Sequence, residues 1–274
     1  MVLIPKKEPT LVEIIDEGSI EQEKRPHLGY SQVGSDCMRE MFYILHWAED
    51  QTYDLRIGRI FSTGHIMEKF MIESLEKAGM IVEDQQDYVP GLWGHIKGSI
   101  DGIVSNVPGY ENERLLLEMK TANDRSWKSI SKEGVKRAHK KHYGQIQMYM
   151  GRLRLKNALY MVYNKNDSSY YTEIVPFNSN YFKEKEVALA DMMLSEHIPM
   201  KIGDVTWHEC RMCNFKGVCH NGDPVAENCR TCIHADVEDD GVWSCGVHDI
   251  KLTFDEQLKG CKRWEVLESL NGES

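Results

Sequence analysis

The stretch "LLLEMKTAN", residues 115–123, combines the pattern of a buried strand with two charged side chains. Three leucines in a row predict a strand inside the protein, yet Glu118 and Lys120 follow directly. Residues two apart along a strand point to the same face, so the carboxylate and the ammonium group lie side by side. A buried face accommodates such a pair only where it borders something polar, such as a cleft, a metal ion or water.

A second carboxylate precedes this stretch. The segment "GSIDGIV", residues 98–104, carries Asp101, and the "PGY" sequence at 108–110 predicts a turn, so the two segments form a hairpin. The hairpin places Asp101 and Glu118 at one sheet edge, where two carboxylates repel unless a divalent cation such as Mg²⁺ lies between them. The spacing D-x16-E-x-K therefore predicts metal-dependent phosphodiester hydrolysis, with Lys120 orienting or deprotonating a water. A salt-bridged surface hairpin is the alternative.

The remaining pattern predicts an α/β fold with one mixed sheet flanked by helices. Apolar residues at three- and four-residue steps predict a helix over about 56–78. Further helices are expected within 34–50, 132–153 and 178–196, and strands within 80–89, 94–104, 114–122, 157–165 and 169–177.

Length and composition are those of a soluble globular protein. The 274 residues suffice for one large domain with an appendage, and 41% are hydrophobic and 28% charged. No apolar run is long enough to span a membrane, and the start "MVLIPKKEPT" does not resemble a secretory signal, so we expect a cytoplasmic protein.

The formal charge of −10 argues against a generally basic nucleic-acid binder but leaves room for a local basic groove. The candidates for such a groove are Lys136, Arg137, Lys140 and Lys141, which crowd into six residues. A solvated helix face is the alternative for this segment.

The cysteines form two groups, with Cys37 far upstream of the other seven. The first group, Cys210, Cys213 and Cys219, needs a fourth ligand from elsewhere, either Cys37 or, in a zinc site, His208 or His220. The second group predicts a structural zinc site, with His234 and His248 as possible substitutes: Cys229, Cys232, Cys245 and Cys261. DNA and a protein partner are both open as the contact of this second module, and its local acidity favours a protein.

The motifs of this chain resemble the active-site signature of the PD-(D/E)XK nuclease superfamily. His65 in "STGHIMEKF" and Gln145 with Tyr149 in "YGQIQMYM" are similar to the histidine and the Q-x-x-x-Y motif of its RecB-like branch. The resemblance covers about residues 30–220, and it departs from the superfamily name because isoleucine, not proline, precedes Asp101. Gln147 is an alternative to Gln145, but only Gln145 has a tyrosine four residues later.

The resemblance implies a restriction-endonuclease-like fold and a role for each matched residue. His65, Asp101, Glu118 and the carbonyl of Met119 would hold Mg²⁺ or Mn²⁺, and Lys120 would position the water. Gln145 and Tyr149 would touch the substrate or brace the lysine. Cys37 with the first cysteine group resembles the iron–sulfur subset of this branch, which implies a [4Fe–4S] cluster on Cys37, Cys210, Cys213 and Cys219. That subset includes the AddB nuclease domain and CRISPR-associated adaptation nucleases.

These observations lead us to expect a nuclease domain over residues 1–222, closed by the cluster, and a zinc module over 223–274. The expected activity is a DNA exonuclease of recombination, repair or degradation, as in phages and mobile elements, in bacterial or host cytoplasm. The alternatives are a CRISPR-type nuclease that trims DNA ends, a sequence-specific endonuclease, and a scaffold that binds DNA ends without cleaving them. Expected partners are DNA ends or single strands, a recombination or single-strand-annealing protein, or a second copy of the chain, and no membrane.

Overall fold

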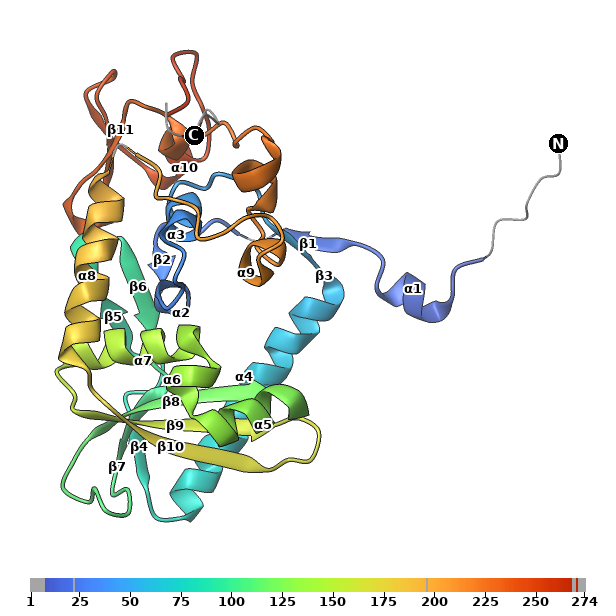
Figure 1. Cartoon of the computed structure of the whole chain (residues 1–274), viewed down its shortest axis with the longest axis vertical. Coiled ribbons are helices and arrows are strands. Elements are labelled where there is room, and N and C mark those ends of the chain that lie inside the picture. The colour runs from blue at the N-terminus through green and yellow to red at the C-terminus, as the bar shows by residue number, and fades with distance from the viewer. Residues whose placement is uncertain (1–7, 22, 196, 268–269, 271–274) are drawn as a thin grey trace.

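The computed structural model describes residues 8–21, 23–195, 197–267 and 270, and its centre is a mixed five-stranded sheet (Figure 1). The strand order is β10-β9-β8-β7-β4, in which β8 and β9 run parallel and the other neighbours antiparallel. The strands are β4 (Ile81–Glu83), β7 (Gly102–Ser105), β8 (Leu115–Ala122), β9 (Asn157–Asn164) and β10 (Tyr170–Pro176). The expected mixed sheet and the β7–β8 hairpin are therefore confirmed.

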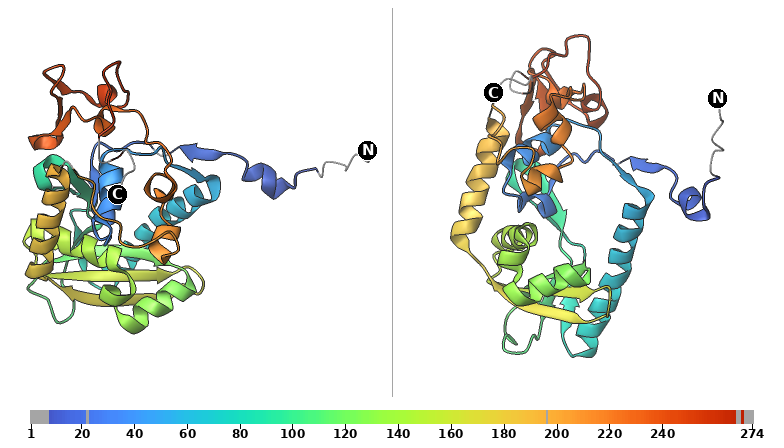
Figure 2. Two further views of the ribbon diagram at one scale, coloured as in Figure 1. Left: turned by 45° about the horizontal axis from the view of Figure 1, so that its top comes forward. Right: turned by 45° about the vertical axis from the view of Figure 1, so that its right-hand side comes forward.

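Helices cover both faces of this sheet (Figure 2), which explains the unbroken leucine run of β8. Helix α4 (Leu55–Lys77) packs with Leu115 and Leu117 in one hydrophobic cluster. Helix α7 (Lys140–Leu153) packs with Leu116 in the other. Because side chains alternate along a strand, Glu118 and Lys120 share the α7 face with Leu116.

The prediction of a single helix over 132–153 is wrong for the first part of this range. The chain forms α5 (Asp124–Glu133), α6 (Val135–Ala138) and then α7. Gly134 ends α5 with φ +75°, a conformation that favours glycine, and His139 separates α6 from α7 with an extended φ of −148°. The last expected helix is confirmed as α8 (Ser179–Leu194).

A second sheet makes the expectation of one sheet wrong as well. Strands β2 (Leu28–Gly29), β5 (Tyr88–Pro90) and β6 (Ile96–Ser99) form their own three-stranded sheet. Asp84 and Gln86 adopt φ of 53° and 59°, which ends β4 and divides the segment expected as one strand. The chain crosses back between β6 and β7, so Asp101 lies where the two sheets meet.

The N-terminal part lies beside this second sheet and also extends away from the body (Figure 1). Helices α2 (Tyr30–Val33) and α3 (Met38–Leu45) follow β2. Helix α1 (Leu11–Ile15) and β1 (Ser19–Glu21) form an arm that pairs with β3 (Thr52–Asp54). No helix in the described part of the chain is both long enough and apolar enough to cross a bilayer.

The cysteine-rich C-terminal part contains a small antiparallel sheet of β11 (Ala235–Val237), β12 (Trp243–Cys245) and β13 (Ile250–Leu252). Its other helical turns are α9 (His208–Arg211), α10 (Phe254–Gln257), a π-turn η2 (Gly217–Asn221), and the 3₁₀ turns η3 (Cys229–Thr231) and η4 (Asp239–Gly241). A further 3₁₀ turn, η1 (Leu92–Gly94), lies against η4. Trp243 and Leu252 join the main hydrophobic core, so this part is packed onto the body.

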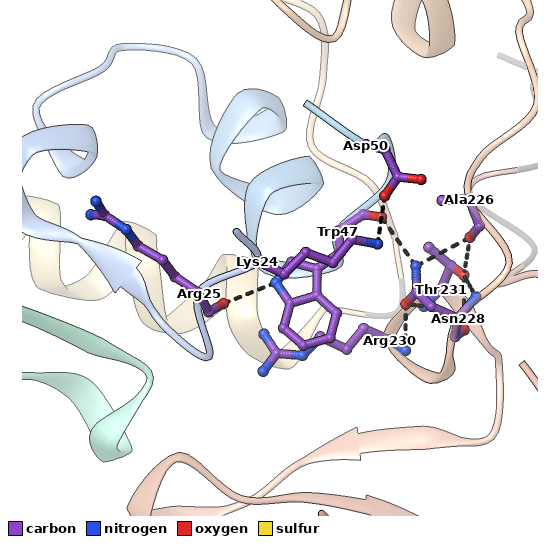
Figure 3. Close-up of polar contacts among 8 residues, drawn as sticks. All are labelled: Lys24, Arg25, Trp47, Asp50, Ala226, Asn228, Arg230 and Thr231. Carbon is purple, nitrogen blue, oxygen red and sulfur yellow. Dashed lines mark hydrogen bonds and ion pairs between the residues drawn. The ribbon is translucent and has the colours of Figure 1, made fainter. Parts of the chain in front are cut away.

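Arg230 of η3 forms a buried contact between the C-terminal part and the body (Figure 3). Its side chain is 1% exposed, and its guanidinium carbon lies 3.7 Å from the ring centroid of Trp47 and 4.9 Å from that of Trp243. It donates hydrogen bonds to the carbonyls of Leu45 (2.9 Å) and Pro26 (3.0 Å) and to Gln257 (2.7 and 2.9 Å). Burial lowers the pKa of Arg230 to about 9, so the side chain is still a cation at neutral pH.

Candidate active site

Asp101 is held against β8 by the backbone of that strand. Its Oδ2 accepts a hydrogen bond of 2.5 Å from the amide of Met119. Because Met119 directly follows Glu118, this bond fixes the Asp101 carboxylate beside Glu118, as the hairpin predicts. The two carboxylates therefore meet where the two sheets join.

Glu118 and Lys120 form an ion pair on the α7 face of β8. The Glu118 side chain is 0% exposed and that of Lys120 is 25% exposed. Burial raises the pKa of Glu118 to about 7, the Asp101 carboxylate adds to this, and Lys120 opposes it. Burial lowers the pKa of Lys120, but the carboxylates of Glu118, Asp101 and Glu68 outweigh it, so the net pKa is raised and the amine stays protonated.

Glu118 is short of partners for a buried carboxylate. Apart from the ion pair with Lys120, neither of its oxygens meets a hydrogen-bond donor in the described residues. An ionised carboxylate in apolar surroundings is costly unless cations or donors surround it. The donor set of Glu118 and Asp101 therefore fits a hard divalent cation.

Glu68 on α4 is a site residue that the sequence analysis missed. Burial raises its pKa, and the nearby Asp101 carboxylate raises it further, while Lys120 opposes. Glu68 therefore adds a third carboxylate to this region from a different element. The available signal was its place three residues after His65, on the same helix face.

His65 lies further out than Glu68. Its side chain is 78% exposed, and its Nδ1 is 3.6 Å from Glu68 Oε1, the one ion-pair contact that the described residues give it. The structure thus links His65 to the carboxylate group through Glu68. A direct role of His65 as a metal ligand stays a prediction, as does that of the Met119 carbonyl.

Gln145 and Tyr149 lie one turn apart on α7 and are both buried, as the Q-x-x-x-Y spacing predicts. The Tyr149 hydroxyl donates to the carbonyl of Ser99 at 2.8 Å, and Gln145 lies beside that hydroxyl. Gln147 is occupied elsewhere, because its amide bonds to Pro176 and Asn178 after β10. Of the two glutamines, Gln145 is therefore the one beside Tyr149, and its role at the site stays a prediction.

The basic segment expected to bind DNA is partly neutralised by ion pairs. Lys140 contacts Asp36 at 2.5 Å, and Lys141 contacts Glu40 at 3.3 Å. Lys136 lies over the ring of Tyr143, 5.7 Å from its centroid, and Arg137 is exposed. Two of the four expected DNA contacts thus hold α7 against α3 and the segment before it.

All eight cysteines are free, and each predicted set shares one cavity. A cavity of about 310 Å³ is lined by the first set together with His208 and His220: Cys37, Cys210, Cys213 and Cys219. A cavity of about 520 Å³ is lined by the second set together with His234 and His248: Cys229, Cys232, Cys245 and Cys261. As the side chains of the described residues stand, no three His, Cys, Asp or Glu are grouped closely enough to hold an ion.

No model of a known protein family matches the sequence, and no curated protein matches it. Solved structures with a similar chain path include an alkaline exonuclease (LHK-Exo) from Laribacter hongkongensis, at 15% identity over 62% of this chain and 87% of that one, with a TM-score of 0.45. The structure of the same exonuclease in complex with dAMP is 15% identical over 61% of this chain and 86% of that one, with a TM-score of 0.42. The structure of SSO0001 is 17% identical over 72% of this chain and 88% of that one, with a TM-score of 0.42. At these identities and TM-scores, the likeness identifies neither the activity nor the substrate of this chain.

Proposed function

We propose that this protein is a metal-dependent deoxyribonuclease that hydrolyses phosphodiester bonds, acting as an exonuclease in DNA recombination, repair or degradation. The observation that carries the proposal is the meeting of Asp101, Glu118 and Lys120 at one sheet junction, with Glu118 fully buried and short of donors. Two carboxylates and one ammonium group in this arrangement suit a hard cation and an anionic substrate.

Asp101 and Glu118, with His65 and the carbonyl of Met119, would hold Mg²⁺ or Mn²⁺. When bound, such an ion polarises the scissile phosphate and lowers the pKa of the attacking water. Lys120 would position the water by donating a hydrogen bond to it, from its place beside Glu118. Glu68 adds negative charge at the same place and supports cation binding.

Tyr149 and Gln145 have a positioning role in this proposal. The hydrogen bond from Tyr149 to the carbonyl of Ser99 holds β6 two residues before Asp101. The bond therefore limits how far the segment that leads to Asp101 moves relative to α7. Lys136 and Arg137 remain available to contact phosphates at the rim, whereas Lys140 and Lys141 already have carboxylate partners.

Cleavage of linear and closed circular DNA in Mg²⁺ and in Mn²⁺ tests the activity. We expect the wild type to degrade linear DNA and Asp101→Asn to be at least about 100-fold slower, since a metal ligand is lost. Glu76→Gln, which changes an exposed carboxylate on the same protein, is the matched control and should retain activity. Equal rates for the wild type and Asp101→Asn would end the enzyme proposal and leave a scaffold that binds DNA ends. Cleavage of the circular substrate would instead indicate an endonuclease.

We further propose a [4Fe–4S] cluster on Cys37 and the first C-terminal cysteine group. The supporting observation is that all four thiols line one cavity, although Cys37 caps α3 and the others follow α8. Such a cluster would join two distant parts of the chain. A zinc site that uses His208 or His220 is the alternative, because both line the same cavity.

For residues 223–274 we propose a structural Zn²⁺ site in a separate module. The supporting observation is that the four thiols of the second set line one cavity. Metal analysis tests both sites together. Purification without air should give a brown protein that absorbs near roughly 400 nm, with about four iron and one zinc per chain. Two zinc and no iron would support the alternative for the first set.

A further inference from the structure

A third cavity, of about 450 Å³, lies next to the candidate active site and shares the Gln145 and Tyr149 wall with it. Its other side is formed by β5, β6 and the segment before β2, which contribute Tyr88, Lys97, Arg25 and His27. Lys97 and Asp101 are four residues apart along the chain, which is at most about 13 Å of extended backbone. The cavity is therefore a near neighbour of the proposed cleavage site.

The charge of this cavity is opposite to that of the whole chain. Among the residues that the structure describes, no aspartate or glutamate lines it, although the formal net charge is −10. Within the described residues, neither Arg25 nor Lys97 forms an ion pair, in contrast to Lys140 and Lys141 of the basic segment. Unbalanced positive charge in a recess attracts anions and is the usual footprint of a phosphate site.

An aromatic ring and an unpartnered ring nitrogen complete the lining. Tyr88 is 54% exposed, and the ammonium group of Lys97 lies 5.9 Å from its ring centroid. The Nδ1 atom of His27 is buried and meets no hydrogen-bond partner in the part of the chain that the structure describes. A cationic recess with an exposed tyrosine can take a phosphate and stack its base.

We propose that this cavity binds a nucleotide of the DNA strand that enters the active site, with Lys97 and Arg25 on its phosphate and Tyr88 on its base. This inference rests on the proposed function, since it places the substrate strand on one side of the cleavage site. It also moves the main phosphate contacts away from the ion-paired segment at 136–141. The strand then passes Gln145 and Tyr149 before it reaches Asp101.

Binding without cleavage tests the proposal. A fluorescently labelled oligothymidine is titrated with the full-length protein in EDTA at several salt concentrations, and polarisation is recorded. Lys97→Gln and Arg25→Gln should each weaken binding and lower the slope of log K against log salt by about 0.7, the value for one lost phosphate contact with a single strand. Lys183→Gln, an exposed lysine on α8, is the matched control and should leave the slope unchanged.

Tyr88→Ser provides an independent measurement. Loss of one base stack should weaken binding about 5-fold or more with no change in the salt slope. If Lys97→Gln and Arg25→Gln bind the oligothymidine with the affinity and salt slope of the wild type, the cavity proposal is overturned, even if DNA cleavage is intact. If the wild type shows no nuclease activity but these variants still weaken DNA binding, the cavity proposal is supported and only the enzyme proposal fails.

Discussion

Replacement of Arg230 by methionine should destabilise the whole protein, because this side chain joins the C-terminal part to the body. Methionine keeps much of the volume between Trp47 and Trp243 but donates no hydrogen bonds. The carbonyls of Leu45 and Pro26 and the side chain of Gln257 then lose their donor in a buried place.

Each such acceptor costs about 1–3 kcal/mol, and the stacked cation adds about 2 kcal/mol in a desolvated site. Removal of the cation also removes the cost of burying it, which offsets part of this loss. We therefore expect the free energy of unfolding to fall by about 3–5 kcal/mol. The stability of Arg230→Lys should lie between those of the wild type and Arg230→Met, because lysine keeps the charge but lacks the planar set of donors that arginine has.

Urea unfolding followed by tryptophan fluorescence measures this loss, since Trp47 and Trp243 flank the substituted side chain. With a slope of about 3 kcal/mol per molar urea, the midpoint should fall by about 1–1.7 M. Arg263→Met, at an exposed arginine of the same C-terminal part, should change stability by less than about 0.5 kcal/mol. A midpoint for Arg230→Met within about 0.2 M of wild type would refute the proposed role of these hydrogen bonds.

Three further predictions concern the core and the site. Gly98→Ala should lower stability by about 1–3 kcal/mol, because its Cβ would lie 2.4 Å from the Tyr149 hydroxyl, and Tyr149→Phe in the same chain should restore part of the loss in thermal melting. Burial lowers the pKa of His46 from 6.5 to about 4. As the pH falls, this histidine is therefore protonated in the unfolded chain before it is protonated in the folded one. The free energy of unfolding should fall by about 3 kcal/mol between about pH 6.5 and pH 4. His46→Gln should show a smaller loss over this range in urea titrations at several pH values, and an unchanged loss would contradict the assignment. Lys120→Met removes the cation beside Glu118, so DNA cleavage should disappear. Because burial already raises the pKa of Glu118, its carboxyl should take up a proton in the metal-free variant at neutral pH, and the loss in urea unfolding should be about 1–3 kcal/mol; wild-type stability would show that the ion pair contributes nothing.

The parts of the site that depend on local pattern were predictable from the sequence. The turn at 108–110 and the two-residue period of β8 suffice to place Asp101 near Glu118 and to put Lys120 on the same face. A four-residue helical step likewise places Gln145 near Tyr149. Each of these relations extends over few residues or one hairpin, so packing elsewhere in the chain does not alter it.

The parts that depend on long-range packing were not predictable. Asp36 lies 104 residues before Lys140, so no local pattern indicates that it neutralises this lysine. Glu68 resembles any glutamate on an amphipathic helix until α4 is seen to pass close to Asp101. The crossing between sheets depends on positive φ at Asp84 and Gln86; aspartate adopts this conformation more often than most residues, but glutamine gives no signal for it.

Strand β6 connects the two halves of the molecule in a way that bears on control of cleavage. At its start, His95 bonds through Nε2 to the carbonyl of Glu238 in the C-terminal part, at 2.7 Å, and beyond its other end lies Asp101. One hydrogen bond and the four residues of β6 thus connect the cysteine-rich part to the loop that carries Asp101. Under the proposed function, a protein that docks on the cysteine-rich end would contact the same strand that leads to Asp101, at a place away from the nucleic acid.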